Sequence, residues 1–181
     1  MHDPAAGRIL LPIARAAIST ALGVPLAADE SAPWLAEPGA CFVTLTQQEE
    51  LRGCIGSLQA CRPLLEDVKK NAVAAALHDP RFPPLSLEEL SHTRIEISLL
   101  SPTQPMDFQS EADALAQLRP GIDGVIFEYH GYRSTYLPQV WEHFSQPRQF
   151  LASLKNKAGL PGDFWAEGVK LSRYTVAKWK E

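Results

Sequence analysis

Apolar residues recur every three or four positions in two stretches of the N-terminal half, residues 10–22 and 65–76. This spacing places them on one face of a helix. Gly23 ends the first stretch, because glycine readily adopts the left-handed conformation found after the last turn of a helix. Pro63 precedes the second stretch and suits the first turn of a helix. We therefore predict two amphipathic helices, each with one buried face.

Strand patterns flank the second of these helices. Residues 40–46 are rich in β-branched and aromatic side chains, and residues 51–58 follow after a short polar turn, so together they predict a hairpin. Residues 94–100 alternate between apolar and polar positions, which is typical of a strand with one buried face. Before that strand, Ser86 is placed to open a short helical turn at residues 87–90.

The C-terminal half shows the same mixture of patterns. Its predicted elements are a helix over 110–119, a hairpin of 125–129 with 132–136, a helix over 150–158 and a final strand over 169–179. Helices and hairpins follow one another without the regular strand–helix–strand order of a parallel sheet. We therefore predict an α+β fold with a mainly antiparallel sheet flanked by helices. Because no clear linker interrupts the chain, we expect a single domain over residues 1–181.

Composition excludes several classes of protein. Hydrophobic residues make up 45% of the chain and charged residues 21%, a globular profile that rules out wholesale disorder. No apolar run reaches the roughly 18 residues of a membrane helix, so we expect no membrane segment. The formal net charge of −4 argues against nucleic-acid binding through a bulk positive field. After residue 145, seven basic residues stand against three acidic ones, which indicates either a docking surface for an acidic partner or a solvated helix and edge strand.

The three cysteines, Cys41, Cys54 and Cys61, indicate reduced thiols. Their number is odd, and their spacing lacks the paired arrangement of zinc sites, so no metal is predicted. The N-terminus has no basic segment before its first apolar stretch, so we expect no export signal and a cytoplasmic location. The patterns favour structural roles for Cys41 and Cys61, and they leave open whether Cys61 pairs with Cys54 in a redox step.

Residues 51–56, Leu-Arg-Gly-Cys-Ile-Gly, are the least ordinary segment of the chain. Glycine within a strand marks a bulge or a close approach by a ligand, which makes Gly53 and Gly56 candidates for a binding surface. In a regular strand, Arg52 and Cys54 project from the same face. A guanidinium group beside a thiol raises the fraction of thiolate, the nucleophilic form. The segment is therefore either a reactive thiol in a glycine-opened groove or a packed cysteine with two glycines that accommodate a twist.

Acidic and basic side chains also meet in the turn at residues 78–82. We expect Asp79 to cap this turn and Arg81 to pair with it, and the alternative is that the proline-held loop presents both to a ligand. Glu96 faces away from the apolar side of its strand, so it is either solvated or lines a groove. No histidine is singled out as the base for a cysteine nucleophile. Motifs of nucleotide hydrolases, zinc proteases and α/β-hydrolases are absent from the sequence.

An ordered set of motifs resembles the AMMECR domain family. It comprises Phe-Val-Thr-Leu at 42–45, Leu-Arg-Gly-Cys-Ile-Gly at 51–56, Asp-x-Arg-Phe-x-Pro-Leu at 79–85, Glu-Ile-Ser at 96–98, Asp-Gly at 123–124, Leu-Pro-Gln-Val at 137–140 and Lys-Ala-Gly-Leu at 157–160. This ordered set is far more specific than the Arg-Gly-Cys-Ile-Gly segment alone. The chain is similar to the short prokaryotic form, from the AmmeMemoRadiSam system, which is associated with a Memo-like protein and a radical SAM protein.

The resemblance implies an α+β fold of two lobes with a cleft near the Arg-Gly-Cys-Ile-Gly segment. It also implies functional roles for Cys54 and Arg52 as catalytic residues, and for Gly53, Gly56, Asp79, Arg81, Glu96 and Gln139 as substrate-binding residues. The family's activity is not settled, so the resemblance gives a context rather than a reaction, and no cofactor is predicted.

Two functional hypotheses follow, and the sequence leaves open whether the chain is an enzyme. In the first, an enzyme acts with Memo-like and radical SAM partners on a small molecule or a modified residue. Cys54 is then the nucleophile or acid–base thiol, and Arg52 stabilises the thiolate and binds an anion. In the second, the chain is a non-catalytic binding or scaffold module, and a groove at Arg52, Gly53 and Gly56 holds a peptide, a substrate or a loop of a partner.

Overall fold

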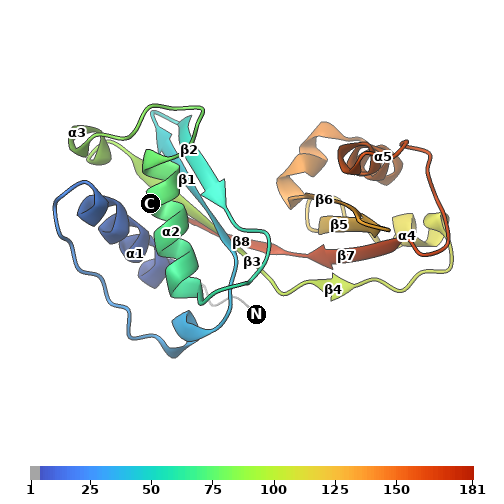
Figure 1. The fold of residues 1–181 in the computed structure, drawn as a ribbon, viewed down its shortest axis with the longest axis horizontal. Coiled ribbons are helices and arrows are strands. Elements are labelled where there is room, and N and C mark those ends of the chain that lie inside the picture. Colours follow the sequence, from blue (N-terminus) through green and yellow to red (C-terminus); the bar gives the residue numbers. More distant parts are fainter. Residues whose placement is uncertain (1–4) are drawn as a thin grey trace. The chain divides into compact units, whose positions relative to one another are not determined.

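The computed structural model describes residues 5–181, shown as a ribbon in Figure 1. The first four residues, part of the segment in which no export signal is expected, lie outside the described residues. The chain divides into two compact units: the first runs to Leu100 and includes Ala177–Glu181, and the second is Ser101–Val176. The expected single domain and the expected cleft stay predictions. Within the described part of the chain, no helix is long and apolar enough to cross a membrane.

The first unit contains two long helices and a four-stranded sheet (Figure 1). The strands lie in the order β2-β1-β3-β8, and β1 is antiparallel to both of its neighbours. The elements in chain order are α1 (Ala6–Ala21), the 3-10 helix η1 (Pro33–Ala36), β1 (Cys41–Gln47), β2 (Glu50–Gly56), α2 (Leu64–Leu77), α3 (Leu87–Leu90), β3 (Arg94–Leu100) and β8 (Val176–Lys180).

Helices α1 and α2 pack against one face of this sheet and bury its apolar side chains. Alternate residues of β1 and β3 point into this core: Cys41, Val43, Leu45, Ile95, Ile97 and Leu99. The other residues of these strands lie on the opposite face of the sheet, because neighbouring side chains of a strand alternate. That opposite face carries Thr44 and Glu96, and the thiol of Cys54 lies on it beside Thr44.

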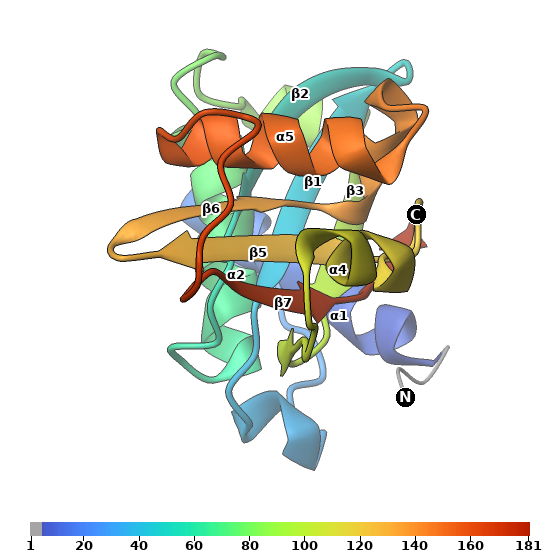
Figure 2. The ribbon, with the colours of Figure 1, turned by 90° about the vertical axis from the view of Figure 1, so that its right-hand side faces the viewer.

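The second unit contains a second sheet, in the order β4-β7-β5-β6, and two helices. Figure 2 shows α5 lying alongside β5 and β6. Its elements are β4 (Gln104–Pro105), α4 (Glu111–Gln117), β5 (Gly124–Tyr129), β6 (Tyr132–Tyr136), the 3-10 helix η2 (Pro138–His143), α5 (Pro147–Ala158) and β7 (Lys170–Tyr174). Aromatic residues dominate its core, where the rings of Trp141 and Phe150 stack with their centroids 3.7 Å apart.

The predicted α+β class with antiparallel pairing is confirmed, although the strands form two sheets rather than one. The prediction of one final strand over residues 169–179 is wrong. Lys170–Tyr174 pairs within the second sheet and Val176–Lys180 within the first, with Thr175 between them. The alternating pattern runs through the whole segment, because alternation indicates that one face of a strand is buried. It does not indicate which sheet the strand joins, so two strands in different sheets give the same pattern as one.

Candidate functional site

Cys54 lies on β2, which is the edge strand of the first sheet. Its side chain is half-buried and faces Thr44 of β1, with 3.3 Å between the Cys54 Sγ and the Thr44 Oγ1. The backbone of an edge strand has no neighbouring strand on its outer side. At Cys54 two side chains fill that position: Asp79 Oδ2 accepts from the backbone N–H at 2.9 Å, and Arg81 Nη2 donates to the backbone C=O at 3.2 Å. The peptide groups around the thiol are therefore held in place from outside the sheet.

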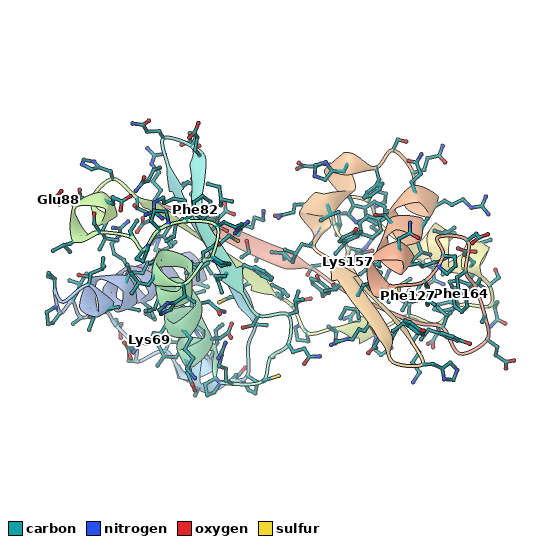
Figure 3. All side chains as sticks on the ribbon, turned by 45° about the horizontal axis from the view of Figure 1, so that its top comes forward. Lys69, Phe82, Glu88, Phe127, Lys157 and Phe164 are labelled. Atoms are coloured by element: carbon teal, nitrogen blue, oxygen red, sulfur yellow. The ribbon has the colours of Figure 1, made fainter. Side chains whose placement is uncertain are left out.

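The Asp79–Arg81 pair forms in the turn that follows α2, as the sequence predicts. Asp79 accepts hydrogen bonds from the Arg81 backbone N–H, from Nε and from Nη2, at distances between 2.7 and 3.1 Å. These bonds, together with the Cys54 N–H, hold the pKa of Asp79 well below its usual range, so the group is a carboxylate. The Asp79 side chain is 2% exposed, whereas that of Arg81 is 54% exposed. Phe82, labelled in Figure 3, lies beside this pair with its ring centroid 5.5 Å from the Arg81 guanidinium carbon.

Arg81 is consequently the cation bound to the backbone of Cys54. The pKa of its guanidinium is raised, first by the hydrogen bond to Asp79 and to a lesser degree by the negative form of Cys54. A guanidinium stays charged at every physiological pH. Its fork is shared between Asp79 and the Cys54 carbonyl group, and its exposed part is open to an anionic group of a ligand.

The expected contact of Arg52 with the Cys54 thiol is wrong. The register of β1 with β2 shifts between Leu45 and Thr46, and Arg52 is the extra residue of the resulting bulge. A bulge redirects the side chain at that position. The Arg52 guanidinium donates instead to Glu89 of α3, from Nε at 3.1 Å and from Nη2 at 3.2 Å. This pairing lowers the pKa of Glu89 to about 2.

The two glycines of the segment make room for the protein's own atoms. A Cβ atom at Gly53 would lie 2.1 Å from the carbonyl oxygen of Ala75 in α2, so glycine lets this helix pack closely on β2. A Cβ atom at Gly56 would lie 2.3 Å from the ring of Phe42. The close approach that these glycines allow is therefore made by α2 and by Phe42, and a ligand contact at either glycine stays a prediction.

Glu96 lies on the same face of the sheet as Cys54. Thr44 pairs with Cys54 on one side and with Glu96 of β3 on the other, so the three side chains form a row across three strands. Glu96 also pairs with Lys178 of β8, at 3.8 Å between Nζ and Oε1. Gln139 is exposed on η2 of the second unit. Asp79 and Arg81 thus lie at the edge of β2 beside Cys54, Glu96 lies on the same face of the sheet two strands away, and Arg52 turns to Glu89.

The sequence missed two residues around the segment. Thr44 contacts the thiol, and its position opposite Cys54 follows from the hairpin register once the turn is known. Asp67 of α2 is fully buried and joins three parts of the first unit, because it accepts from the Cys41 backbone N–H, the Ser57 hydroxyl and Arg62 Nε. An acid in the first turn of a helix is ordinarily an exposed group that interacts with the helix dipole, so no sequence signal marks the burial of Asp67.

The other two cysteines differ in exposure. Cys41 is buried in the first core, and burial raises its pKa, so this thiol is protonated and inert. Cys61 is exposed, and all three cysteines are free. Among residues 5–181, no three histidine, cysteine or acidic side chains come together in a way that could hold a metal ion.

Comparison with known proteins identifies the family. The AMMECR1 family model matches residues 11–179, a range that includes most of both units. Protein MJ0810 of Methanocaldococcus jannaschii is 39% identical over 180 residues, which cover 97% of this chain and 90% of that protein. The crystal structure of the uncharacterised protein PH0010 of Pyrococcus horikoshii is similar, with a TM-score of 0.80 and 35% identity over 97% of this chain and 91% of that one. The chain belongs to the AMMECR1 family.

Proposed function

We propose that this chain is an enzyme, or the catalytic part of one, that uses the Cys54 thiol on a small molecule or on a modified residue of a partner. The supporting observation is that two side chains hold the peptide groups at Cys54 in place. Asp79 and Arg81 fix the backbone of Cys54 on its open side, while the thiol itself stays half-exposed and free. A reacting group that is held in one position by its surroundings does not lose conformational freedom when a substrate binds, which favours catalysis.

In this proposal Arg81 takes the role that the sequence assigned to Arg52. The thiol reacts as thiolate, and a nearby fixed cation stabilises that negative charge. The Thr44 hydroxyl group is placed to donate a hydrogen bond to the sulfur. The exposed part of Arg81 favours a substrate with a carboxylate or phosphate group next to the reacting atom. A Memo-like protein and a radical SAM protein are the proposed partners, on the basis of the family resemblance.

A non-catalytic binding module is the second candidate. The structural contacts of Arg52, Gly53 and Gly56 count against the groove expected at these residues, so the module would use the exposed guanidinium of Arg81 instead. The module is favoured because the hydrogen-bond contact of the Cys54 sulfur among the described residues is with Thr44, which is a weak base compared with histidine or a carboxylate. In this reading Asp79 and Arg81 protect the edge of the sheet, and a partner recognises the exposed guanidinium.

Substitution of single cysteines in the assembled system separates the two candidates. Cys54→Ser removes the thiol but keeps a polar side chain opposite Thr44, and Cys61→Ser is the matched control at an exposed free cysteine. The enzyme proposal predicts that Cys54→Ser abolishes turnover by the protein mixed with its Memo-like and radical SAM partners, while the complex still forms. Full turnover by Cys54→Ser, with loss of the complex in Arg81→Ala, would instead establish the binding module.

A further inference from the structure

The loop that joins α4 to β5 brings two arginines to one buried carboxylate of the second unit. Asp123, the first residue of the Asp-Gly pair at 123–124, is fully buried and directly precedes β5. Arg119 donates to this carboxylate from its backbone N–H at 2.9 Å and from Nη2 at 2.6 Å. Arg173 of β7 places Nη1 4.0 Å from Oδ2 of the same carboxylate. Figure 2 labels α4, β5 and β7, the elements that carry these residues or flank them.

The cluster has one more positive charge than it has negative charges. A guanidinium stays charged at every physiological pH, and Asp123 balances only one of the two. Among residues 5–181, no second carboxylate lies within 4.0 Å of a guanidinium nitrogen of either arginine. The arrangement differs from that of Asp79, which pairs with the single guanidinium of Arg81. Cations held near each other repel, so an anion from outside the chain would stabilise the cluster.

Both guanidinium groups keep N–H groups that the protein does not use. Arg119 binds Asp123 through Nε and Nη2, and Arg173 binds the Gln117 carbonyl oxygen through Nη1 at 3.2 Å. A guanidinium has more N–H groups than these bonds engage. The one buried side-chain nitrogen without a partner among residues 5–181 belongs to Arg52, so the free nitrogens of Arg173 are accessible. The side chains of Arg119 and Arg173 are 51% and 31% exposed, which leaves their remaining donors open to a ligand.

Neighbouring contacts hold the cluster in place. The indole N–H of Trp141 donates to the Asp123 carbonyl oxygen at 2.7 Å. Trp141 is itself buried and stacks on Phe150 in the second core. Arg119 binds the Asp123 carboxylate with both its backbone and its side chain, so the loop is closed by its own hydrogen bonds. Binding groups that are fixed in advance lose little conformational freedom when a ligand arrives, which favours affinity.

We propose that Arg119 and Arg173 bind the carboxylate group of a small molecule. Arginine donates to carboxylate oxygens in a forked geometry, and a carboxylate supplies the single negative charge that the cluster lacks. A phosphate monoester carries about 1.5 to 2 negative charges at pH 7, so part of its charge would be repelled by Asp123. The free donors belong to two side chains at one carboxylate rather than to a row of cations, which favours one functional group over an acidic protein surface. This proposal is independent of the chemistry assigned to Cys54, which lies in the first unit.

Three probes with the same ring test the charge of the bound group on the full-length protein. Benzoate carries one negative charge, benzamide carries none, and phenyl phosphate carries more than one at pH 7. Titrations at constant ionic strength are followed by the indole N–H NMR signal of Trp141 and the backbone amide signals of residues 119–124. We expect benzoate to shift these signals saturably and to bind about tenfold more tightly than benzamide, as hydrogen bonds between charged groups imply. Phenyl phosphate should bind no more tightly than benzoate.

Two arginine variants locate the contact. Arg173→Gln removes one of the two cations and should weaken benzoate binding about tenfold. The new side chain keeps an N–H donor for the Gln117 carbonyl group, and no hydrogen bond to Asp123 is lost at 4.0 Å. Arg148→Gln is the matched control, because Arg148 is exposed on α5 of the same unit.

Four results would each overturn the proposal: equal affinities for benzoate and benzamide, tighter binding of phenyl phosphate than of benzoate, no localised shifts with benzoate, or full benzoate affinity in Arg173→Gln. Should Arg173→Gln fail to fold, the comparison of the probes on the unaltered protein decides alone.

Discussion

Gly53→Ala tests whether this glycine serves the packing of α2 rather than the approach of a ligand. The added Cβ atom would lie 2.1 Å from the Ala75 carbonyl oxygen. Non-bonded heavy atoms prefer roughly 3.5 Å, so β2 and α2 must separate locally by about 1.4 Å. The obstructing atom belongs to the backbone of a buried helical residue, and it has no rotamer by which to move away. Backbone strain does not add to the cost of the substitution, because the φ angle of Gly53 lies outside the left-handed region.

The expected cost follows from this geometry. Overpacking of a core costs about 1–3 kcal/mol. Replacement of glycine by alanine recovers about 0.4–1 kcal/mol by restricting the unfolded chain. Because the clash is with backbone, we expect the upper part of the range, a net loss of about 2 kcal/mol. A loss of this size corresponds to roughly 30-fold faster hydrogen exchange at amides that open only with the first unit.

Hydrogen exchange read by mass spectrometry measures this loss separately in the two units. Peptides from β1 and α2 report on the first unit, and peptides from β5 and α5 provide an internal reference. Gly162→Ala is the control variant, because its added Cβ would lie 3.2 Å from the Ala152 Cβ, a tight contact that a shift of a few tenths of an ångström relieves. A Gly53→Ala protein with exchange within about threefold of the unaltered protein would refute the packing explanation and restore the ligand explanation for this glycine.

Two further predictions concern the charges and thiols of the first unit. Asp79→Asn should destabilise it by about 1.5–3 kcal/mol at pH 7, as expected for hydrogen bonds to a charged group. Because the pKa of Asp79 is lowered by folding, this stabilisation is complete above the unfolded pKa of about 3.9 and is lost as the pH falls through the folded value. Urea unfolding of both proteins between pH 7 and pH 3 should show the difference shrink, and a constant difference would contradict it. For the thiols, iodoacetamide at pH 8 should label exposed Cys61 and leave buried Cys41 unlabelled until urea unfolds the protein; labelling of native Cys41 would contradict its placement.

Local patterns predicted much of the first unit. The hairpin of β1 and β2 follows from two strand patterns and a short polar turn, and its register places Thr44 opposite Cys54. The Asp79–Arg81 pair was also predictable, because its members are two residues apart in a turn. In each of these cases the interacting groups are close in sequence or are joined by a single turn.

The orientation of Arg52 could not be predicted in this way. One extra residue in a strand changes the face on which a side chain lies, and nothing in the pattern of residues 51–56 distinguishes a bulge from a regular strand. Its partner Glu89 is 37 residues away, beyond α2. The burial of Asp67 could not be predicted for the same reason, since its partners on Cys41 and Ser57 are brought to it by tertiary packing.

We propose that Cys54 is the reacting thiol and that Arg81, not Arg52, is the cation that stabilises its thiolate. The most direct test is the rate of iodoacetamide labelling of Cys54 at pH 7, with exposed Cys61 of the same molecule as the reference. We predict that half-buried Cys54 reacts faster than Cys61, that Arg81→Gln slows Cys54 alone, and that Arg52→Gln leaves the ratio unchanged. A Cys54 that stays unlabelled until the protein unfolds, or a ratio that changes with Arg52→Gln and not with Arg81→Gln, would contradict the claim.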